Sequence, residues 1–164
     1  MPPSQRLADL EELIETNYQK LAKFQKRLDR TASVREEFDI EGDIPKIRKV
    51  IRNYEAEYWA LLAQETYSYA VEEDEASSAI VEVQAQVLQV IKSQPNLNDE
   101  LMQKLEAILE KLNQPETPVA AKAMLTLPLI PGILSYEFEL DTENSLRRAF
   151  DPIKKLYKRA LEKK

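Results

Sequence analysis

The sequence of 164 residues contains no histidine, no cysteine and only two glycines. Without histidine, the chain lacks the usual general base and the imidazole ligands of many metal sites. Without cysteine, it lacks thiol nucleophiles, disulfides and thiolate ligands. The two glycines, Gly42 and Gly132, stand far apart, whereas dinucleotide fingerprints and phosphate-binding loops need several glycines close together. We therefore expect a protein that is not an enzyme and that binds neither a cofactor nor a metal ion.

The charge balance and the hydropathy pattern argue against nucleic-acid-binding, membrane-spanning and secreted proteins. The net charge is −6, which suits a nucleic-acid backbone poorly and argues against nucleic acid as a partner. No stretch offers the run of about 18 apolar residues that a membrane-spanning helix needs. The N-terminal residues lead into an amphipathic pattern without the apolar core of a signal peptide. We expect a cytoplasmic protein.

The first 70 residues carry two apolar patterns that are typical of paired helices. Over residues 4–30, apolar residues recur at the two core positions of a heptad, with one polar exception: Leu7, Leu10, Ile14, Asn17, Leu21, Phe24 and Leu28. Such a narrow seam favours a coiled coil, in which Asn17 either lies at the margin or sets the register. After a connector over residues 29–43, a second helix should begin at Asp43 with Pro45 in its first turn. Its seam is Ile47, Ile51, Tyr54, Tyr58 and Leu61. We predict a mainly α fold that opens with an antiparallel coiled-coil hairpin over residues 1–70.

Residues 71–164 are predicted to form a smaller helical module. The acidic run of residues 72–75 favours the first turn of a new helix, because carboxylates stabilise helix N-termini. Asn96 or Asn98 should cap the helix that follows, over residues 99–112. The apolar stretch 119–136 is interrupted by prolines, and after Pro131 apolar and polar residues alternate. This alternation predicts a half-buried strand, so that residues 124–140 should form an extended segment.

The C-terminal segment is basic, although the chain as a whole is acidic. Residues 147–164 hold eight basic and two acidic side chains, on a helix that Asp141 or Thr142 would cap and that would restart at Asp151. The basic residues can form a solvated face, bind an acidic surface including residues 72–75 of the same chain, or contact a membrane or nucleic acid. The candidate contacts for an anionic partner are Arg147, Arg148, Lys154, Lys155, Lys158 and Arg159.

Two groups of aromatic residues are candidates for protein contacts. Tyr54, Tyr58 and Trp59 lie close together on the second helix. They either form the hairpin core or make an interaction patch, since Tyr and Trp are enriched among interface anchors. Tyr136 and Phe138 lie on the apolar face of the predicted strand, which could add to the sheet edge of a partner.

Two stretches resemble proteins of cyanobacteria. Residues 49–64, KVIRNYEAEYWALLAQ, resemble the helical hairpins of effector-associated domains in prokaryotic conflict and signalling systems. Residues 129–143, LIPGILSYEFELDTE, with the basic tail, resemble a C-terminal module that accompanies such hairpins. The resemblance implies an adaptor that recruits an effector or a NACHT-type NTPase through helical contacts, and it implies no catalytic residues.

These observations predict a non-enzymatic adaptor that acts in signalling or defence by helix-on-helix association. Its partners would be proteins, and we favour self-association along the helical seams. The alternative is a membrane-active effector that uses residues 119–136 and the basic tail. The prolines within that segment and its short length argue against the alternative.

Overall fold

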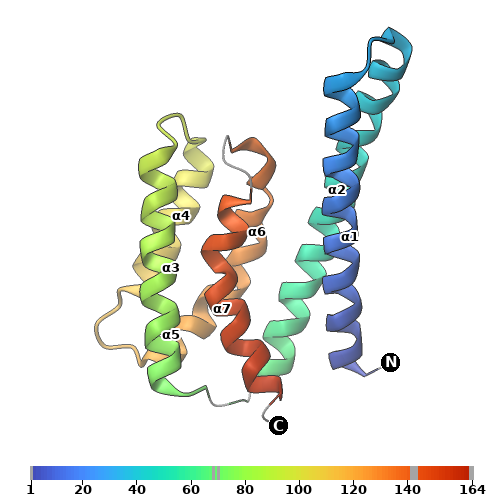
Figure 1. Ribbon diagram of the computed structural model, residues 1–164. Coiled ribbons are helices and arrows are strands. Elements are labelled where there is room, and N and C mark those ends of the chain that lie inside the picture. The colour runs from blue at the N-terminus through green and yellow to red at the C-terminus, as the bar shows by residue number, and fades with distance from the viewer. Residues whose placement is uncertain (1, 68, 70, 141–143, 163–164) are drawn as a thin grey trace. The chain divides into compact units, whose positions relative to one another are not determined.

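The computed structural model describes residues 2–67, 69, 71–140 and 144–162. Within these residues the chain is built from helices and turns and contains no strand, which confirms the mainly α fold class. The chain divides into two compact units, Met1–Tyr58 and Trp59–Lys164, whereas the sequence placed a boundary at residue 70. The boundary falls within one helix, so residues 34–58 of that helix belong to the first unit and residues 59–66 to the second. The helices are labelled in Figure 1.

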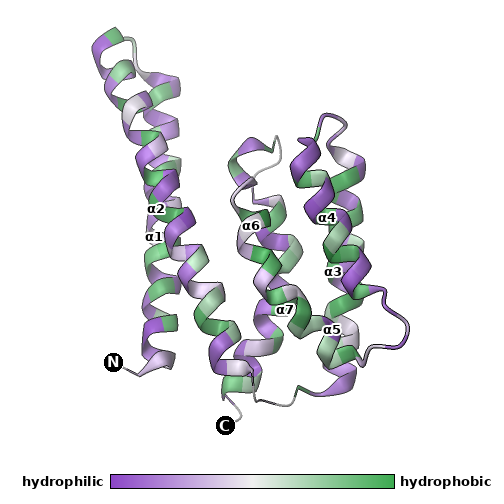
Figure 2. Cartoon of the chain, turned by 180° about the vertical axis from the view of Figure 1, so that it is seen from behind, coloured by the Kyte–Doolittle hydropathy of each residue, from purple (hydrophilic) through white to green (hydrophobic). Residues whose placement is uncertain are grey.

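The first unit is a helical hairpin. Helix α1 (Pro3–Arg30) and helix α2 (Val34–Thr66) are joined by a short turn at residues 31–33, and they lie side by side in both views (Figures 1 and 2). Ion pairs near the two ends of the hairpin show that the helices are antiparallel: Arg6 Nε to Glu57 Oε2 at 2.6 Å, and Arg27 Nη2 to Glu36 Oε1 at 3.2 Å. The coiled-coil character of the seam stays a prediction.

The core of the hairpin follows the spacing of its apolar residues. The buried residues recur every three or four positions, as one face of a helix requires. They are Leu7, Leu10, Ile14 and Leu21 of α1, and Ile40, Ile44, Ile47, Ile51 and Tyr58 of α2. Figure 2 shows apolar and polar residues alternating along both helices. Asn17, at a seam position, is half-buried, and its side-chain amide donates to the Leu13 carbonyl at 2.7 Å.

The predicted connector over residues 29–43 is wrong, because α2 begins at Val34 and contains both Gly42 and Pro45. A proline inside a helix costs about 3 kcal/mol, since it lacks an N–H group and crowds the preceding turn. Burial of each Ile side chain contributes about 1.5–3 kcal/mol, so Ile40, Ile44 and Ile47 together outweigh that cost. Ser33 caps the helix, because its Oγ accepts from the Glu36 N–H at 3.3 Å. The sequence Ser33-Val34-Arg35-Glu36 has the spacing of a capping box, which marks this start.

The second unit is a bundle of helices. It contains α3 (Glu73–Ser93), α4 (Asp99–Leu112), α5 (Val119–Thr126), α6 (Ile130–Leu134) and α7 (Ser145–Glu162). Two short 3₁₀ turns, η1 (Leu127–Leu129) and η2 (Glu137–Glu139), flank α6. Helix α3 packs most extensively against α7, and it also contacts α4 and α5.

The predicted starts of α3 and α4 are confirmed. The first turn of α3 contains Glu73, Asp74 and Glu75 of the acidic run. Asn98 caps α4, because its Oδ1 accepts from the Glu100 N–H at 2.8 Å and from the Leu101 N–H at 3.4 Å. These side-chain bonds satisfy N–H groups that have no partner inside the helix.

The extended segment predicted over residues 124–140 is wrong, because these residues form the end of α5, η1, α6 and η2. A strand needs hydrogen-bonding partners along its whole length, and the described residues offer no second strand. The backbone finds local partners instead: the N–H groups of Tyr136, Glu139 and Leu140 donate to carbonyls three residues earlier. Apolar residues of the segment lie in the core of the unit, namely Leu127, Ile130, Ile133 and Leu134.

Helix α7 carries the basic tail and also completes the core. Its buried residues lie on one face, namely Leu146, Ala149, Phe150, Ile153, Leu156 and Tyr157. The predicted restart at Asp151 is wrong, because the helix continues through Pro152. Burial of the apolar face on both sides of Pro152 stabilises the continuous helix. The predicted caps Asp141 and Thr142 lie outside the described residues. Among the described residues, no helix combines the length and apolar character that a membrane span requires.

Candidate interaction surfaces

The aromatic residues predicted on α2 lie mostly inside the protein. Tyr58 is 0% exposed and Trp59 is 3% exposed, while Tyr54 is half-buried. The Tyr58 hydroxyl donates to Glu11 Oε1 at 2.6 Å, which joins α2 to α1 within the hairpin. Of the two interpretations left open by the sequence, the core position is the one in which Tyr58 and Trp59 are found. Contact with a partner through these two side chains would require the fold to open.

The second aromatic pair lies on the 3₁₀ turn η2 and just before it. Tyr136 and Phe138 are both half-buried. The Tyr136 hydroxyl is hydrogen-bonded to the Glu100 carboxylate, and this bond raises the pKa of Tyr136. Glu137 lies between them in the sequence and is buried, so the alternation of exposed and buried side chains expected of a strand is absent. Their role in binding a partner stays a prediction.

Glu137 has a structural role that the sequence did not indicate. Its side chain is 4% exposed and lies at the N-terminus of α7. One carboxylate oxygen accepts from the Leu146 N–H at 3.0 Å, and the other accepts from the Arg147 N–H at 3.2 Å. Burial raises the pKa of Glu137, and the two backbone N–H groups offset that effect only in part. Glu137 therefore caps α7 from outside that helix, a role that no local spacing could indicate.

The basic residues of α7 surround its buried face. Arg148, Lys155 and Arg159 are exposed, whereas Arg147, Lys154 and Lys158 are half-buried. Arg147 and Arg148 also lie near Glu137 and favour its ionised form. Lys155 pairs with Asp151 one turn earlier, with Nζ 3.0 Å from Oδ2. Exposed pairs of this kind contribute little to stability.

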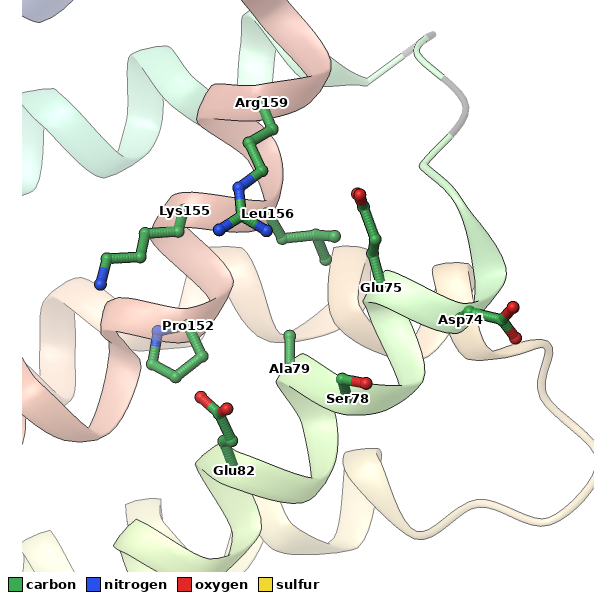
Figure 3. A pocket seen from close by; sticks show the side chains of 9 residues that line it. All are labelled: Asp74, Glu75, Ser78, Ala79, Glu82, Pro152, Lys155, Leu156 and Arg159. Atoms are coloured by element: carbon green, nitrogen blue, oxygen red, sulfur yellow. The ribbon is translucent and has the colours of Figure 1, made fainter.

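Helix α7 and the acidic start of α3 form an open groove of about 430 Å³. Three carboxylates line it from α3, and Lys155 and Arg159 line it from α7. Figure 3 shows the Arg159 guanidinium beside Leu156 on the α7 side of the groove, while Asp74 points away from α7. The structure thus brings the basic tail next to the acidic run of the same chain, which is the arrangement that one of the three interpretations of the tail requires. Contact of the tail with another anionic partner stays a prediction.

The apolar face of α7 is not available to a membrane in this fold. Its apolar side chains are buried, as are Leu127, Ile130 and Ile133 from the apolar stretch 119–136. Contact of these buried residues with a bilayer would require α7 to leave the bundle.

The most exposed apolar side chains of the hairpin lie near its turn. Val34 is 81% exposed and Phe38 is 76% exposed. They are four residues apart on α2, so they lie on the same face of the helix. Both fall within the connector predicted over residues 29–43, so the sequence did not indicate them as contact residues. The capping box at Ser33 was the signal that would have put both residues on a helix.

The chain matches no model of a known protein family, no curated protein and no solved structure.

Proposed function

We propose that this chain is a non-enzymatic protein-interaction module, an adaptor that binds partners through the turn end of its helical hairpin. The observation that supports this proposal is the exposure of Val34 and Phe38, 81% and 76%, on one face of α2. Single exposed apolar residues are common on proteins, but aromatic residues including Phe are enriched in the cores of protein interfaces.

The energetics favour a docked state for these residues. Full burial of a Val or Phe side chain contributes about 1.5–3 kcal/mol. Both side chains sit on one helical face, which is the arrangement that helix-in-groove or helix-on-helix recognition uses. Charged residues flank the two positions, including Arg35 and Glu37, and they supply the polar rim that surrounds an apolar contact.

The biological setting proposed is cyanobacterial signalling or defence. It rests on the resemblance of residues 49–64 and 129–143 to effector-associated hairpins and their companion modules. In that setting the hairpin seam would be a coiled coil, and the partner would be a second copy of the chain, an effector or an NTPase.

Site-specific photo-crosslinking tests the proposal. A photoreactive phenylalanine analogue replaces Phe38 in the full chain, in cells that express it at its native level. The matched control carries the analogue at Gln103, an exposed position of α4. We expect covalent protein adducts at position 38 and few at position 103. Equal labelling at the two positions, or no adduct at position 38, would contradict the proposed surface.

A further inference from the structure

The side of α2 that faces away from α1 carries a second regular stripe. We call the outer stripe the residues Val34, Phe38, Glu41, Pro45, Lys49, Arg52 and Ala56. They follow one another at intervals of three or four, so they lie along one side of the helix. All of them are exposed, whereas Ile40, Ile44, Ile47 and Ile51 on the other side are buried. The stripe is therefore a continuous unpartnered face on an ordered helix.

The charges along this part of α2 are separated by sign. Residues 34–43 hold five acidic side chains and one basic side chain, a net charge of −4. Residues 46–52 hold four basic side chains and no acidic one, a net charge of +4. Pro45 lies between the two blocks, in the middle of the outer stripe. A helix with this distribution attracts a second copy that runs in the opposite direction and repels one that runs in the same direction in register.

The residues of the stripe are matched to one another in such an antiparallel arrangement. When Pro45 lies opposite Pro45 of a second copy, equal steps along the two helices bring Glu41 opposite Lys49. The next steps bring Phe38 opposite Arg52 and Val34 opposite Ala56. The first pair is an ion pair, the second joins a cation to an aromatic ring, and the third is apolar. Because the arrangement has twofold symmetry, each pair occurs twice.

The charged groups of the stripe are available for this contact. In the part of the chain that the structure describes, Glu41, Lys49 and Arg52 have no ion-pair partner. Small residues also permit a close approach: Ala56 lies in the stripe, and Gly42 borders it with no atom within 4 Å of the position of an added Cβ.

We infer that the outer stripe of α2 is a homodimerisation surface, which binds the same stripe of a second copy in antiparallel orientation. This inference rests on the proposed function, because it names the partner of the exposed surface at the turn end of the hairpin. It accounts for the solvent exposure of Val34 and Phe38 by giving each a matching residue on the second copy.

Charge reversal tests the inference in the full-length chain. Sedimentation equilibrium at low ionic strength should show a dimer that weakens as salt is added. Glu41→Lys alone places two cations opposite each other, and Lys49→Glu alone places two anions opposite each other. Each should weaken the dimer about tenfold or more. The double variant should restore dimerisation, and an equimolar mixture of the two single variants should form heterodimers. Glu12→Lys, at an exposed position of α1, is the control and should leave the dimer unchanged.

Disulfide trapping tests the orientation, since the natural chain has no cysteine. A mixture of Val34→Cys and Ala56→Cys chains should form disulfide-linked dimers faster than either chain alone. Faster linkage of the Val34→Cys chain with itself would overturn the antiparallel arrangement, as it would indicate parallel helices.

The outcomes separate this inference from the proposed function. The inference is overturned if the chain stays monomeric, or if the charge reversals leave the dissociation constant of the dimer unchanged. If such a chain still gives adducts with a different protein at position 38, the proposed interaction surface stands. If position 38 gives no adduct and the chain is monomeric, both proposals fail.

Discussion

Removal of the Glu137 carboxylate should selectively destabilise the second unit. In Glu137→Ala, the N–H groups of Leu146 and Arg147 lose the acceptors that lie 3.0 and 3.2 Å away. The Leu146 bond is buried, and an unsatisfied buried N–H costs about 1–3 kcal/mol. The Arg147 bond is partly buried, so water can replace some of it. Against this loss, the variant no longer buries a carboxyl group. We expect a net decrease of about 2 kcal/mol in the free energy of unfolding, at the upper end of the range for helix caps.

Fluorescence-detected urea denaturation measures this effect, because Trp59 is the single tryptophan, is buried and is the first residue of the second unit. With a denaturant slope of about 2 kcal/mol per molar urea, the midpoint should fall by about 1 M. Glu137→Gln keeps one acceptor oxygen and should lose about half as much. The matched control is Glu139→Ala, an exposed residue of the same turn, which should stay within about 0.5 kcal/mol of the natural chain. The reasoning is refuted if Glu137→Ala is as stable as the control, or if Glu137→Gln is the less stable of the two variants.

Three further predictions concern buried polar groups. Because burial raises the pKa of Glu137, the native state keeps this proton to higher pH than the unfolded chain does. Stability relative to Glu137→Gln should therefore fall as pH rises from the ordinary value of about 4.3 through the raised native pKa, and urea midpoints across this range should show it; a difference that grows with pH would contradict the direction of the shift. Among the described residues, the Tyr157 hydroxyl is buried without a hydrogen-bond partner, so Tyr157→Phe should be neutral or more stable by about 1 kcal/mol in the same assay. A loss of stability in this variant would reveal a partner. Tyr58→Phe should cost about 1 kcal/mol by losing the bond to Glu11, and Tyr58→Ala about 3–5 kcal/mol by leaving a cavity, as followed by circular dichroism; equal losses would place the whole effect in the hydroxyl.

The helices could be predicted from the sequence wherever apolar spacing and capping residues agreed. The regular intervals of Leu7, Leu10 and Ile14 located α1, and Asn98 with the residues after it located α4. The start of α2 was missed because Gly42 and Pro45 are usual signals of a turn. In the folded hairpin, Gly42 and Pro45 each destabilise the helix locally. Burial of isoleucines on both sides of Pro45 contributes more free energy than these two residues cost.

The strand prediction failed for a different reason. Alternation from Leu134 to Leu140 predicts a strand only if the polar positions face solvent. Glu137 occupies one of those positions, yet it is buried because the N-terminus of α7 supplies its hydrogen-bond donors. A contact between residues 137 and 146 does not change the spacing of apolar residues, so the hydropathy pattern cannot indicate it. From the sequence, burial of Tyr58 and Trp59 was only one of two alternatives. The same residue types, Tyr and Trp, occur both in protein cores and at interfaces.

The packing of α3 against α7 has a consequence for synthesis of the chain on the ribosome. The apolar face of α3 includes Ala76, Ile80, Val83 and Val87, and its most extensive contact is with the helix made last in this unit. The hairpin helices α1 and α2 are neighbours in the sequence, so they can pair soon after they leave the exit tunnel. Helices α4 and α5 can cover part of α3 earlier, but the part of its apolar face that packs against α7 stays uncovered until residues 145–162 have been made. Nascent chains arrested before α7 should therefore be the species that chaperones bind and that aggregate.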